Sequence, residues 1–442
     1  MNDIKIGIVS LGCAKNTVDT EMMMGILSRE GFNFVQKPQD AQVIIINTCG
    51  FINDAKKESI DTIFEMSEYK KKTGVRGIVV TGCLSKRYKE LLFKDLPEAD
   101  VFLGTENYHK IVQAVTAAYN GERKMFFDDA SIDYTPQDRV LTTNPHSAYI
   151  KIAEGCNNRC SYCAIPFIRG DFRSRSYESV LEEAEYLVSI GVKEITLIAQ
   201  DTTKYGRDIY GKACLAELLK KVSDVNGVKW LRVLYSYPEG ITDEVLDVIY
   251  KTPNICNYID MPIQHFSNRV LKMMNRQNTF ESVMGLIKKI RSNYPEMILR
   301  TTLMVGFPSE DQEDFEILKK SVIKARFDRL GVFKFSKEED TKAYEFDETV
   351  SEEEKGTRHK EIMDIQKEIS YKKNQERVSK TYSVLIDEYD EDIFMYLGRS
   401  FEIAPESDGK IYVASKSQLE IGSFYDVVIN KAEYHDLMGE AR

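Results

Sequence analysis

The chain has 442 residues, and its 70 acidic residues outnumber its 60 basic residues to give a net charge of −10. This length predicts two or three domains, and the acidic balance argues against a protein that coats nucleic acid. The chain shows no charged-then-apolar leader and no apolar run near eighteen residues, so we expect a cytoplasmic protein with no membrane segment. In such a chain the eight cysteines indicate metal ligands rather than disulfides.

The N-terminal third alternates short β-branched runs with amphipathic stretches. Strands are expected at residues 6–10, 43–46 and 78–81, and helices near residues 19–29 and 54–69. Strands that alternate with helices predict an α/β unit with a parallel, doubly wound sheet. We expect this unit to span residues 3–119.

Three cysteines directly follow these three strands. Cys13 ends the sequence Leu-Gly-Cys, Cys49 lies in Asn-Thr-Cys-Gly, and Cys83 ends Thr-Gly-Cys. Because ligands of open parallel sheets gather at the carboxyl ends of the strands, the three thiols can converge on one edge and hold a cluster. The adjacent glycines suit tight turns and a close approach of the backbone to an inorganic cluster. The alternative is three unrelated cysteines in a nucleotide-binding sheet.

A second group of cysteines follows a short apolar strand at residues 149–153. Cys156, Cys160 and Cys163 are spaced as C-x3-C-x2-C. Thiolates favour iron–sulfur clusters or zinc, and a structural zinc site takes four protein ligands whereas this loop offers three. An open metal corner indicates a catalytic centre. The alternatives are a zinc site completed by a distant ligand such as His146, or plain buried cysteines.

The alternation of strands and helices resumes after this loop. Together with residues 149–153, strands are expected at residues 194–199, 230–235, 258–261, 298–305 and 330–335. Six such units predict an incomplete (β/α)6 barrel over residues 142–373, with its chemistry at the carboxyl ends of the strands. Residues 121–145, which include Pro136 and Pro145, are expected to connect the barrel to the N-terminal unit.

The last part of the chain, residues 376–442, changes to short strands separated by Gly, Asp and Ser. Strands at 382–386, 395–398, 410–413 and 425–429 predict a small antiparallel β-barrel. Residues 378–442 hold six basic and thirteen acidic residues. Phosphate backbones bind through Lys and Arg, so this domain suits a basic protein partner better than tRNA. The simpler alternative is that the acidity only keeps the domain soluble.

The cysteine loop, with Tyr162 just before its third cysteine, resembles the cluster motif of the radical S-adenosylmethionine (SAM) superfamily. The resemblance implies that Cys156, Cys160 and Cys163 hold a 4Fe–4S cluster whose fourth iron binds SAM. Many members carry Gly-Gly-Glu after the second strand, whereas this chain has Ala199-Gln200-Asp201. The candidate SAM-contacting residues are Tyr162, Gln200, Asp201, Ser236 and Arg300.

The N-terminal cysteine segments resemble those of the methylthiotransferases, in which three such residues bind an auxiliary 4Fe–4S cluster. Phe51-Ile52 after Cys49, and the stretches at residues 199–206 and 257–264, are similar to the RimO type, which modifies a ribosomal protein. The C-terminal unit resembles a TRAM domain, with the ending Leu437-Met438-Gly439-Glu440.

This resemblance implies a radical SAM enzyme that adds a methylthio group to the β-carbon of an aspartate in small-subunit ribosomal protein twelve. In the family scheme, a 5′-deoxyadenosyl radical takes the hydrogen atom, and sulfur arrives from the auxiliary cluster. Two 4Fe–4S clusters, SAM and an external electron donor are expected. The alternatives are a MiaB-type tRNA-adenosine methylthiotransferase and a non-enzymatic iron–sulfur RNA-binding adaptor.

Overall fold

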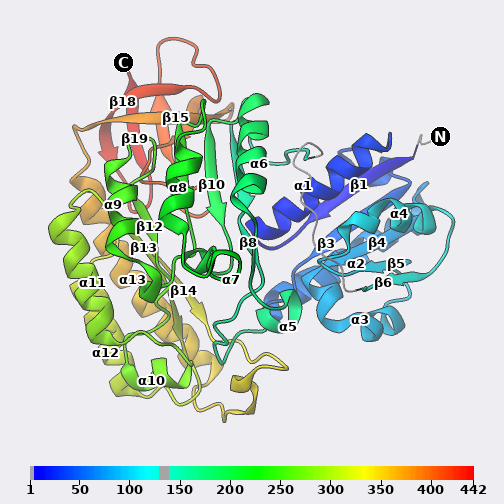
Figure 1. Ribbon diagram of the computed structural model, residues 1–442, viewed down its shortest axis with the longest axis horizontal. Coiled ribbons are helices and arrows are strands. Elements are labelled where there is room, and N and C mark those ends of the chain that lie inside the picture. The colour runs from blue at the N-terminus through cyan, green and yellow to red at the C-terminus, as the bar shows by residue number, and fades with distance from the viewer. Residues whose placement is uncertain (1–3, 129–138) are drawn as a thin grey trace.

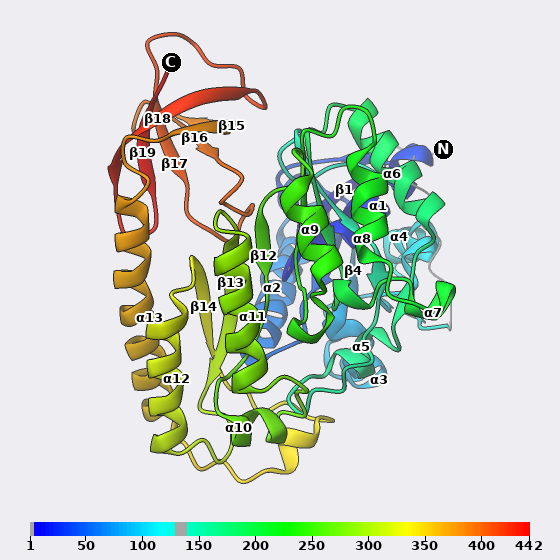
Figure 2. The same cartoon turned by 60° about the vertical axis from the view of Figure 1, so that its left-hand side comes forward.

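The computed structural model describes residues 4–128 and 139–442, which form three units (Figure 1). The N-terminal unit, in blue and cyan, lies beside a central unit drawn mainly in green and yellow. Figure 2 shows the long helix α13 (Glu352–Gln375) leading out of the central unit into the C-terminal unit, drawn in orange and red. Within the two described ranges, every helix is too short or too polar to cross a bilayer.

The N-terminal unit is built on a six-stranded sheet in which all neighbouring strands are parallel. In sheet order, the strands are β2 (Asn33–Phe34), β1 (Lys5–Ser10), β3 (Val43–Thr48), β4 (Gly77–Gly82), β5 (Val101–Leu103) and β6 (Lys124–Phe126). This confirms the predicted parallel sheet and adds three strands. The added strands have two or three residues each, too few to show a pattern in the sequence.

Helices cover both faces of this sheet. Helices α1 (Ala14–Arg29) and α4 (Ile111–Tyr119) pack on one face, and α2 (Asn53–Lys72) and α3 (Cys83–Asp95) pack on the other. The strands between them are buried on both sides, as doubly wound sheets are. Strand β6 lies inside the segment predicted as a connection, and residues 129–138 of that segment, with Pro136, lie outside the described residues.

The central unit contains six parallel strands in chain order, which confirms the predicted incomplete barrel. They are β7 (Ser147–Lys151), β10 (Glu194–Ile198), β11 (Trp230–Val233), β12 (Tyr258–Asp260), β13 (Ile298–Val305) and β14 (Arg329–Lys334). They form two three-stranded ladders, which meet at a bridge between Leu231 and Ile255. A short antiparallel pair, β8 (Ala153–Glu154) and β9 (Arg173–Ser174), flanks the cysteine loop.

Helices follow the barrel strands, and the longer ones cover the outside of the sheet. They are α5 (Ile165–Arg169), α6 (Tyr177–Ser189), α7 (Arg207–Tyr210), α8 (Leu215–Ser223), α9 (Asp243–Lys251), α10 (Asn268–Met273), α11 (Phe280–Asn293) and α12 (Gln312–Ala325). The short 3-10 turns η4 (Thr202–Lys204) and η5 (Pro238–Gly240) follow the second and third strands. Helix α1 of the N-terminal unit packs on β7. The two units therefore share one apolar core on this side.

The C-terminal unit is a closed barrel of five strands. In barrel order they are β15 (Thr381–Asp390), β16 (Met395–Arg399), β17 (Ile411–Ala414), β19 (Leu437–Ala441) and β18 (Phe424–Ala432). The predicted small barrel is confirmed, but two details differ. Strand β19 was not predicted, and it pairs with β17 in parallel, whereas the other pairs are antiparallel.

The C-terminal barrel is fixed to the central unit by charged and aromatic contacts. Arg399 donates to Glu194 at 2.6 Å, and the ring of Phe424 meets that of Trp230 edge to face. In the loop between β16 and β17, Asp408 accepts from the Tyr258 hydroxyl at 2.7 Å and lies 3.6 Å from Arg300. This loop therefore reaches the inner face of the central barrel.

Candidate active site

The three N-terminal cysteines lie at the carboxyl edge of the parallel sheet, each between a strand and a helix. Cys13 precedes α1, Cys49 follows β3, and Cys83 is the first residue of α3. Because β1, β3 and β4 are neighbours in the sheet, these distant residues share one edge. A Cβ atom on Gly12 would lie 3.2 Å from the Cys49 sulfur, so the first two cysteine loops touch.

The three thiols of this N-terminal trio differ in burial. Cys13 is exposed, Cys49 is half-buried and Cys83 is buried. Burial raises the pKa of Cys49, and it raises the pKa of Cys83 to about 11. Arg169 of the central unit opposes both shifts, and its Nη2 lies 3.5 Å from the Cys83 sulfur. A metal centre needs deprotonated thiols, and the positive charge of Arg169 would stabilise a thiolate at Cys83.

Glycine makes the turn before Cys83 possible. Gly82 has φ +93°, and a Cβ atom on it would lie 2.3 Å from Asn47 Oδ1 and 2.4 Å from the Thr48 carbonyl oxygen. A side chain at this position would therefore meet both a left-handed backbone conformation and a severe clash. Gly82 thus allows Cys83 to begin its helix directly above the end of β3.

The central trio, Cys156, Cys160 and Cys163, lies on one loop after β8. The loop closes on itself, because the Cys156 amide donates to the Gly170 carbonyl at 3.1 Å. Its middle is held by the Ser161 amide, which donates to the Met274 carbonyl at 3.0 Å. Burial and the neighbouring Cys160 raise the pKa of Cys156 and of Cys163.

The donor sets of both trios fit an iron–sulfur cluster better than a single ion. Each trio offers only soft thiol ligands, and all of them except the exposed Cys13 are buried or partly buried. Within residues 4–128 and 139–442, no three His, Cys, Asp or Glu side chains come close enough to hold one metal ion. His146, the alternative zinc ligand, instead has its Nε2 at 2.9 Å from Asp387. A wider centre with thiolate ligands remains compatible with both trios.

A cavity of about 290 Å³, which we call the inner cavity, lies against the central trio. Cys156 and Cys163 line it, together with three of the candidate SAM residues, Tyr162, Gln200 and Arg300. The other two units also contribute to its wall. They supply Phe51, two residues after Cys49, and Ser407 of the C-terminal unit.

The segment after Cys13 contacts one aromatic residue in the wall of the inner cavity. Tyr235 lines the cavity, and the ammonium group of Lys15 lies 3.2 Å from the centre of its ring. Lys15 is buried two residues after Cys13, and burial lowers its pKa to about 8. The cavity wall is therefore directly backed by the segment that carries the first N-terminal cysteine.

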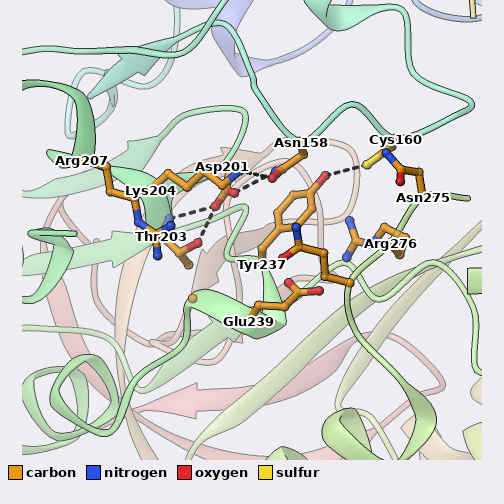
Figure 3. Close-up of a pocket in the computed structure, with 12 residues that line it drawn as sticks. Asn158, Cys160, Asp201, Thr203, Lys204, Arg207, Tyr237, Glu239, Asn275 and Arg276 are labelled. Carbon is orange, nitrogen blue, oxygen red and sulfur yellow. Dashed lines mark hydrogen bonds between the residues drawn. The ribbon is translucent and has the colours of Figure 1, made fainter. Parts of the chain in front are cut away.

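A second, smaller pocket lies next to Cys160 and shares Tyr237 with the inner cavity, and we call it the outer pocket (Figure 3). In it, Asp201 accepts from Asn158 Nδ2 at 2.8 Å and from Thr203 Oγ1 at 2.6 Å. Both carboxylate oxygens of Asp201 are thus engaged, and they tie the cysteine loop to the turn after the second strand. Of the five candidate SAM residues, Asp201 is placed where it supports the loop.

Ser236, the remaining candidate, is almost fully buried and lines neither of these two cavities. Its hydroxyl lies 3.3 Å from Thr202 Oγ1, and its amide donates to the Asp260 carbonyl at 2.8 Å. These contacts join the ends of the second, third and fourth barrel strands. The structure thus brings Tyr162, Gln200 and Arg300 to the inner cavity and leaves Ser236 behind its wall.

Two residues next to Cys160 are not among the five candidate SAM residues. The Tyr237 hydroxyl lies 3.4 Å from the Cys160 sulfur, and the Arg276 guanidinium lies 4.1 Å from the centre of the Tyr237 ring, as Figure 3 shows. Arg276 is buried, and its Nη1 has no hydrogen-bond partner among the described residues. No local pattern in the sequence indicates that Arg276 contacts this tyrosine.

Family profiles match three parts of the chain. The uncharacterized protein family UPF0004 matches residues 5–104, the Radical SAM superfamily matches residues 150–322, and the TRAM domain matches residues 378–441. These three matches follow the three units of the fold.

Curated proteins resemble the chain over almost its whole length. A protein of Caldicellulosiruptor saccharolyticus named ribosomal protein uS12 methylthiotransferase RimO is 50% identical over 440 residues, which cover 99% of both chains. Proteins of the same name from Acetivibrio thermocellus and Clostridioides difficile are 44% and 47% identical, over 99% of this chain and 98% of their own. The chain belongs to the RimO family.

Membership in the RimO family makes this chain a radical SAM methylthiotransferase, an enzyme that uses SAM and 4Fe–4S chemistry. Solved structures agree at the level of the fold. The radical SAM methyltransferase TsrM from Kitasatospora setae, with cobalamin and a [4Fe-4S] cluster bound, matches with a TM-score of 0.52 at 14% identity, over 76% of this chain and 75% of its own. The radical SAM enzyme OxsB matches with a TM-score of 0.50 at 13% identity, over 81% of this chain and 56% of its own. The predicted family is thus confirmed.

Proposed function

We propose that this RimO-family chain transfers a methylthio group to the β-carbon of an aspartate in ribosomal protein uS12, protein twelve of the small subunit. The observation that carries the proposal is the match over 99% of the chain to relatives that bear this name. The inner cavity supports it, because its wall combines the central cysteine loop with residues of the N-terminal and C-terminal units.

In this proposal each cysteine trio holds one 4Fe–4S cluster. Cys156, Cys160 and Cys163 would hold the cluster that binds SAM, and Cys13, Cys49 and Cys83 would hold the auxiliary cluster. When bound, these groups supply the radical that breaks an unactivated C–H bond and the sulfur that replaces the hydrogen, which side chains alone cannot do. Three protein ligands leave one corner of each cluster free.

The side chains of the inner cavity would bind and orient SAM. Arg300 is the main cation of the wall, and it is held in place by Asp260 at 2.9 Å. Gln200 lines the inner cavity, and its amide oxygen can accept a hydrogen bond from the SAM amino group. Tyr162 and Phe333 give the cavity aromatic walls that exclude water from a reactive intermediate.

The C-terminal barrel supports a protein substrate rather than tRNA. Its six basic residues are outnumbered by thirteen acidic ones, and several of the basic ones are paired, such as Arg399 with Glu194. A phosphate backbone would be repelled, whereas a basic ribosomal protein would be attracted and oriented. We also propose that an external one-electron donor reduces the SAM cluster and that the reaction takes place in the cytoplasm, where ribosomes are assembled.

A direct comparison of two substrates tests this function. Anaerobically reconstituted protein would be incubated with SAM and a reductant, together with either purified uS12 or tRNA. We expect uS12 alone to gain the mass of one methylthio group, and fragmentation to place it on an aspartate. The Cys160→Ala variant is the control and should leave uS12 unchanged. Modification of tRNA alone would overturn the proposed substrate.

A further inference from the structure

Arg169 of the central unit contacts the N-terminal cysteine trio. It is 1% exposed, and its Nη2 lies 3.5 Å from the Cys83 sulfur and 2.7 Å from Asn16 Oδ1. The same guanidinium bonds Asp19 at 3.1 Å and Glu154 at 2.8 Å. One buried cation thus joins a sulfur, an amide and two carboxylates from both units.

The backbone that carries Arg169 belongs to the loop of the other trio. Helix α5 begins two residues after Cys163 and ends on Arg169, and the next residue, Gly170, accepts the Cys156 amide. The apolar side of the same short helix packs against the N-terminal trio, since Ala164 and Ile168 form a buried cluster with Cys83. The loop that carries the central trio therefore also carries the arginine that contacts the N-terminal trio.

Arg169 lies in a buried network of charges. Arg169 and Lys151 face Asp19 and Glu154, and the buried Lys15 adds a third cation nearby. A thiolate at Cys83 would add a negative charge, which the guanidinium group 3.5 Å from its sulfur would stabilise. Arginine suits this position better than lysine, because its planar fork bonds Glu154 through Nη1 while the two hydrogens of Nη2 face Asn16, Asp19 and the Cys83 sulfur.

Hydrogen bonds and positive charge at a cluster ligand stabilise the reduced, more negative state of a cluster and so raise its reduction potential. We propose that Arg169 is a positioning residue of the auxiliary cluster, supplied by the SAM-cluster loop, which orients Cys83 and raises the reduction potential of that cluster. This inference rests on the proposed function in one respect, namely that Cys13, Cys49 and Cys83 hold a cluster. A residue on the loop that holds the SAM-binding cluster would then tune the reduction potential of the auxiliary cluster.

The test isolates the auxiliary cluster in the full-length chain. Cys156, Cys160 and Cys163 are all replaced by Ala, and the remaining cluster is titrated with reductant and followed by electron paramagnetic resonance. In this background we expect Arg169→Gln to move the midpoint potential to a more negative value, and Arg169→Lys to move it by a smaller amount in the same direction.

A matched control removes a buried arginine from another part of the central unit. Arg358 of α13 bonds Glu310 at 2.7 Å and Glu354 at 2.8 Å. Arg358→Gln should leave the midpoint potential of the auxiliary cluster unchanged. An equal shift in Arg358→Gln and Arg169→Gln would overturn the inference, because the effect would then reflect general loss of packing.

Iron analysis separates failure of this inference from failure of the proposed function. A background protein with Arg169 intact that binds no iron would overturn the proposed role of the N-terminal trio, and the inference with it. A bound four-iron cluster whose midpoint potential is the same with Arg169, Lys and Gln would overturn the inference alone. If the Arg169→Gln variant binds no iron, the test uses the Arg169→Lys variant instead. An equal midpoint potential in the Arg169→Lys variant and in the background protein would overturn the inference.

Discussion

The two cysteine trios differ in how the chain assembles them. The central trio lies within eight residues of one loop, so the local sequence alone brings Cys156, Cys160 and Cys163 together. The N-terminal trio comes from three strands and exists only when the sheet pairs β1, β3 and β4 in the correct register. The first is thus a local feature and the second a tertiary one. Changes remote in sequence should damage the N-terminal trio far more than the central one.

The sharpest contrast comes from removing one cysteine of the central trio. Cys160→Ala should abolish reductive cleavage of SAM and reduce product formation by at least about 1,000-fold, because no side chain can replace the radical step. The N-terminal trio should keep its cluster, so iron should fall from about eight to about four per chain. Iron analysis and the yield of 5′-deoxyadenosine check this result. Complete loss of iron would show that the two trios do not bind metal independently.

Replacing a cysteine of the N-terminal trio should separate SAM cleavage from methylthiolation. Cys83→Ala removes a ligand of the N-terminal trio but leaves the central loop intact. We expect SAM cleavage to remain within about threefold of the native rate, while methylthiolation of uS12 falls below detection. Chromatography of 5′-deoxyadenosine and mass spectrometry of uS12 on the same samples measure both. Methylthiolated uS12 from this variant would contradict the assignment of the sulfur-carrying cluster to these cysteines.

A glycine substitution tests the tertiary origin of the N-terminal trio without touching a thiol. Gly82→Ala places a Cβ atom 2.3 Å from Asn47 Oδ1 at a residue with φ +93°. We therefore expect it to lower the unfolding free energy by about 3 kcal/mol and to prevent binding of the N-terminal cluster. Gly74→Ala is the control, because no atom lies within 4 Å of its added Cβ. Urea unfolding and iron content check both. Equal iron content in the two variants would mean that the N-terminal trio still binds its cluster when Cys83 is displaced.

The charges between the two trios predict a dependence of stability on pH. Burial alone would raise the pKa of Glu154, but Arg169 and Lys151 outweigh burial and lower it to about 2. The ion pairs therefore stabilise the fold fully above the unfolded pKa of about 4.3, and their contribution falls as pH drops toward 2. At pH 7, Glu154→Gln should lower the unfolding free energy of the iron-free protein by about 2 kcal/mol. The difference in unfolding free energy between the native protein and Glu154→Gln should shrink as the pH falls from 5 to 3. A constant difference would contradict the lowered pKa of Glu154.

The smallest effect is expected at the hydroxyl next to the central trio. Tyr237→Phe removes the group 3.4 Å from the Cys160 sulfur and preserves the ring under Arg276. Loss of one weak hydrogen bond to a cluster ligand should slow SAM cleavage by about threefold and lower the potential of that cluster slightly. Single-turnover kinetics measure the rate. An unchanged rate would mean that this hydroxyl does not interact with the bound cluster.

Sequence patterns predicted the fold well where elements are long and regular. The parallel N-terminal sheet, the six strands of the incomplete barrel and the small C-terminal barrel were all predicted. The short strands β2, β5 and β6 and the parallel pairing of β19 were not, because two to five residues carry no periodicity and strand partners are chosen by packing.

The residues around the site were harder to predict than the cysteines. Side chains at a strand end alternate between faces, so neighbours such as Gln200 and Asp201 can reach different cavities. Arg169 and Cys83 are 86 positions apart in the chain, and no local pattern signals that an arginine after one cysteine loop will contact another cysteine. Such contacts depend on how the units pack, which single-sequence patterns do not encode.

The loop between β16 and β17 has a consequence for attempts to exchange parts of this enzyme. Ser407 forms part of the wall of the inner cavity, and Asp408 bonds the hydroxyl of Tyr258. The C-terminal unit therefore forms part of the wall of the inner cavity, in addition to its proposed role in recognising a partner. Grafting the corresponding unit from a tRNA-modifying relative would alter this cavity, so a redirected enzyme would need the loop between β16 and β17 preserved along with the new recognition surface.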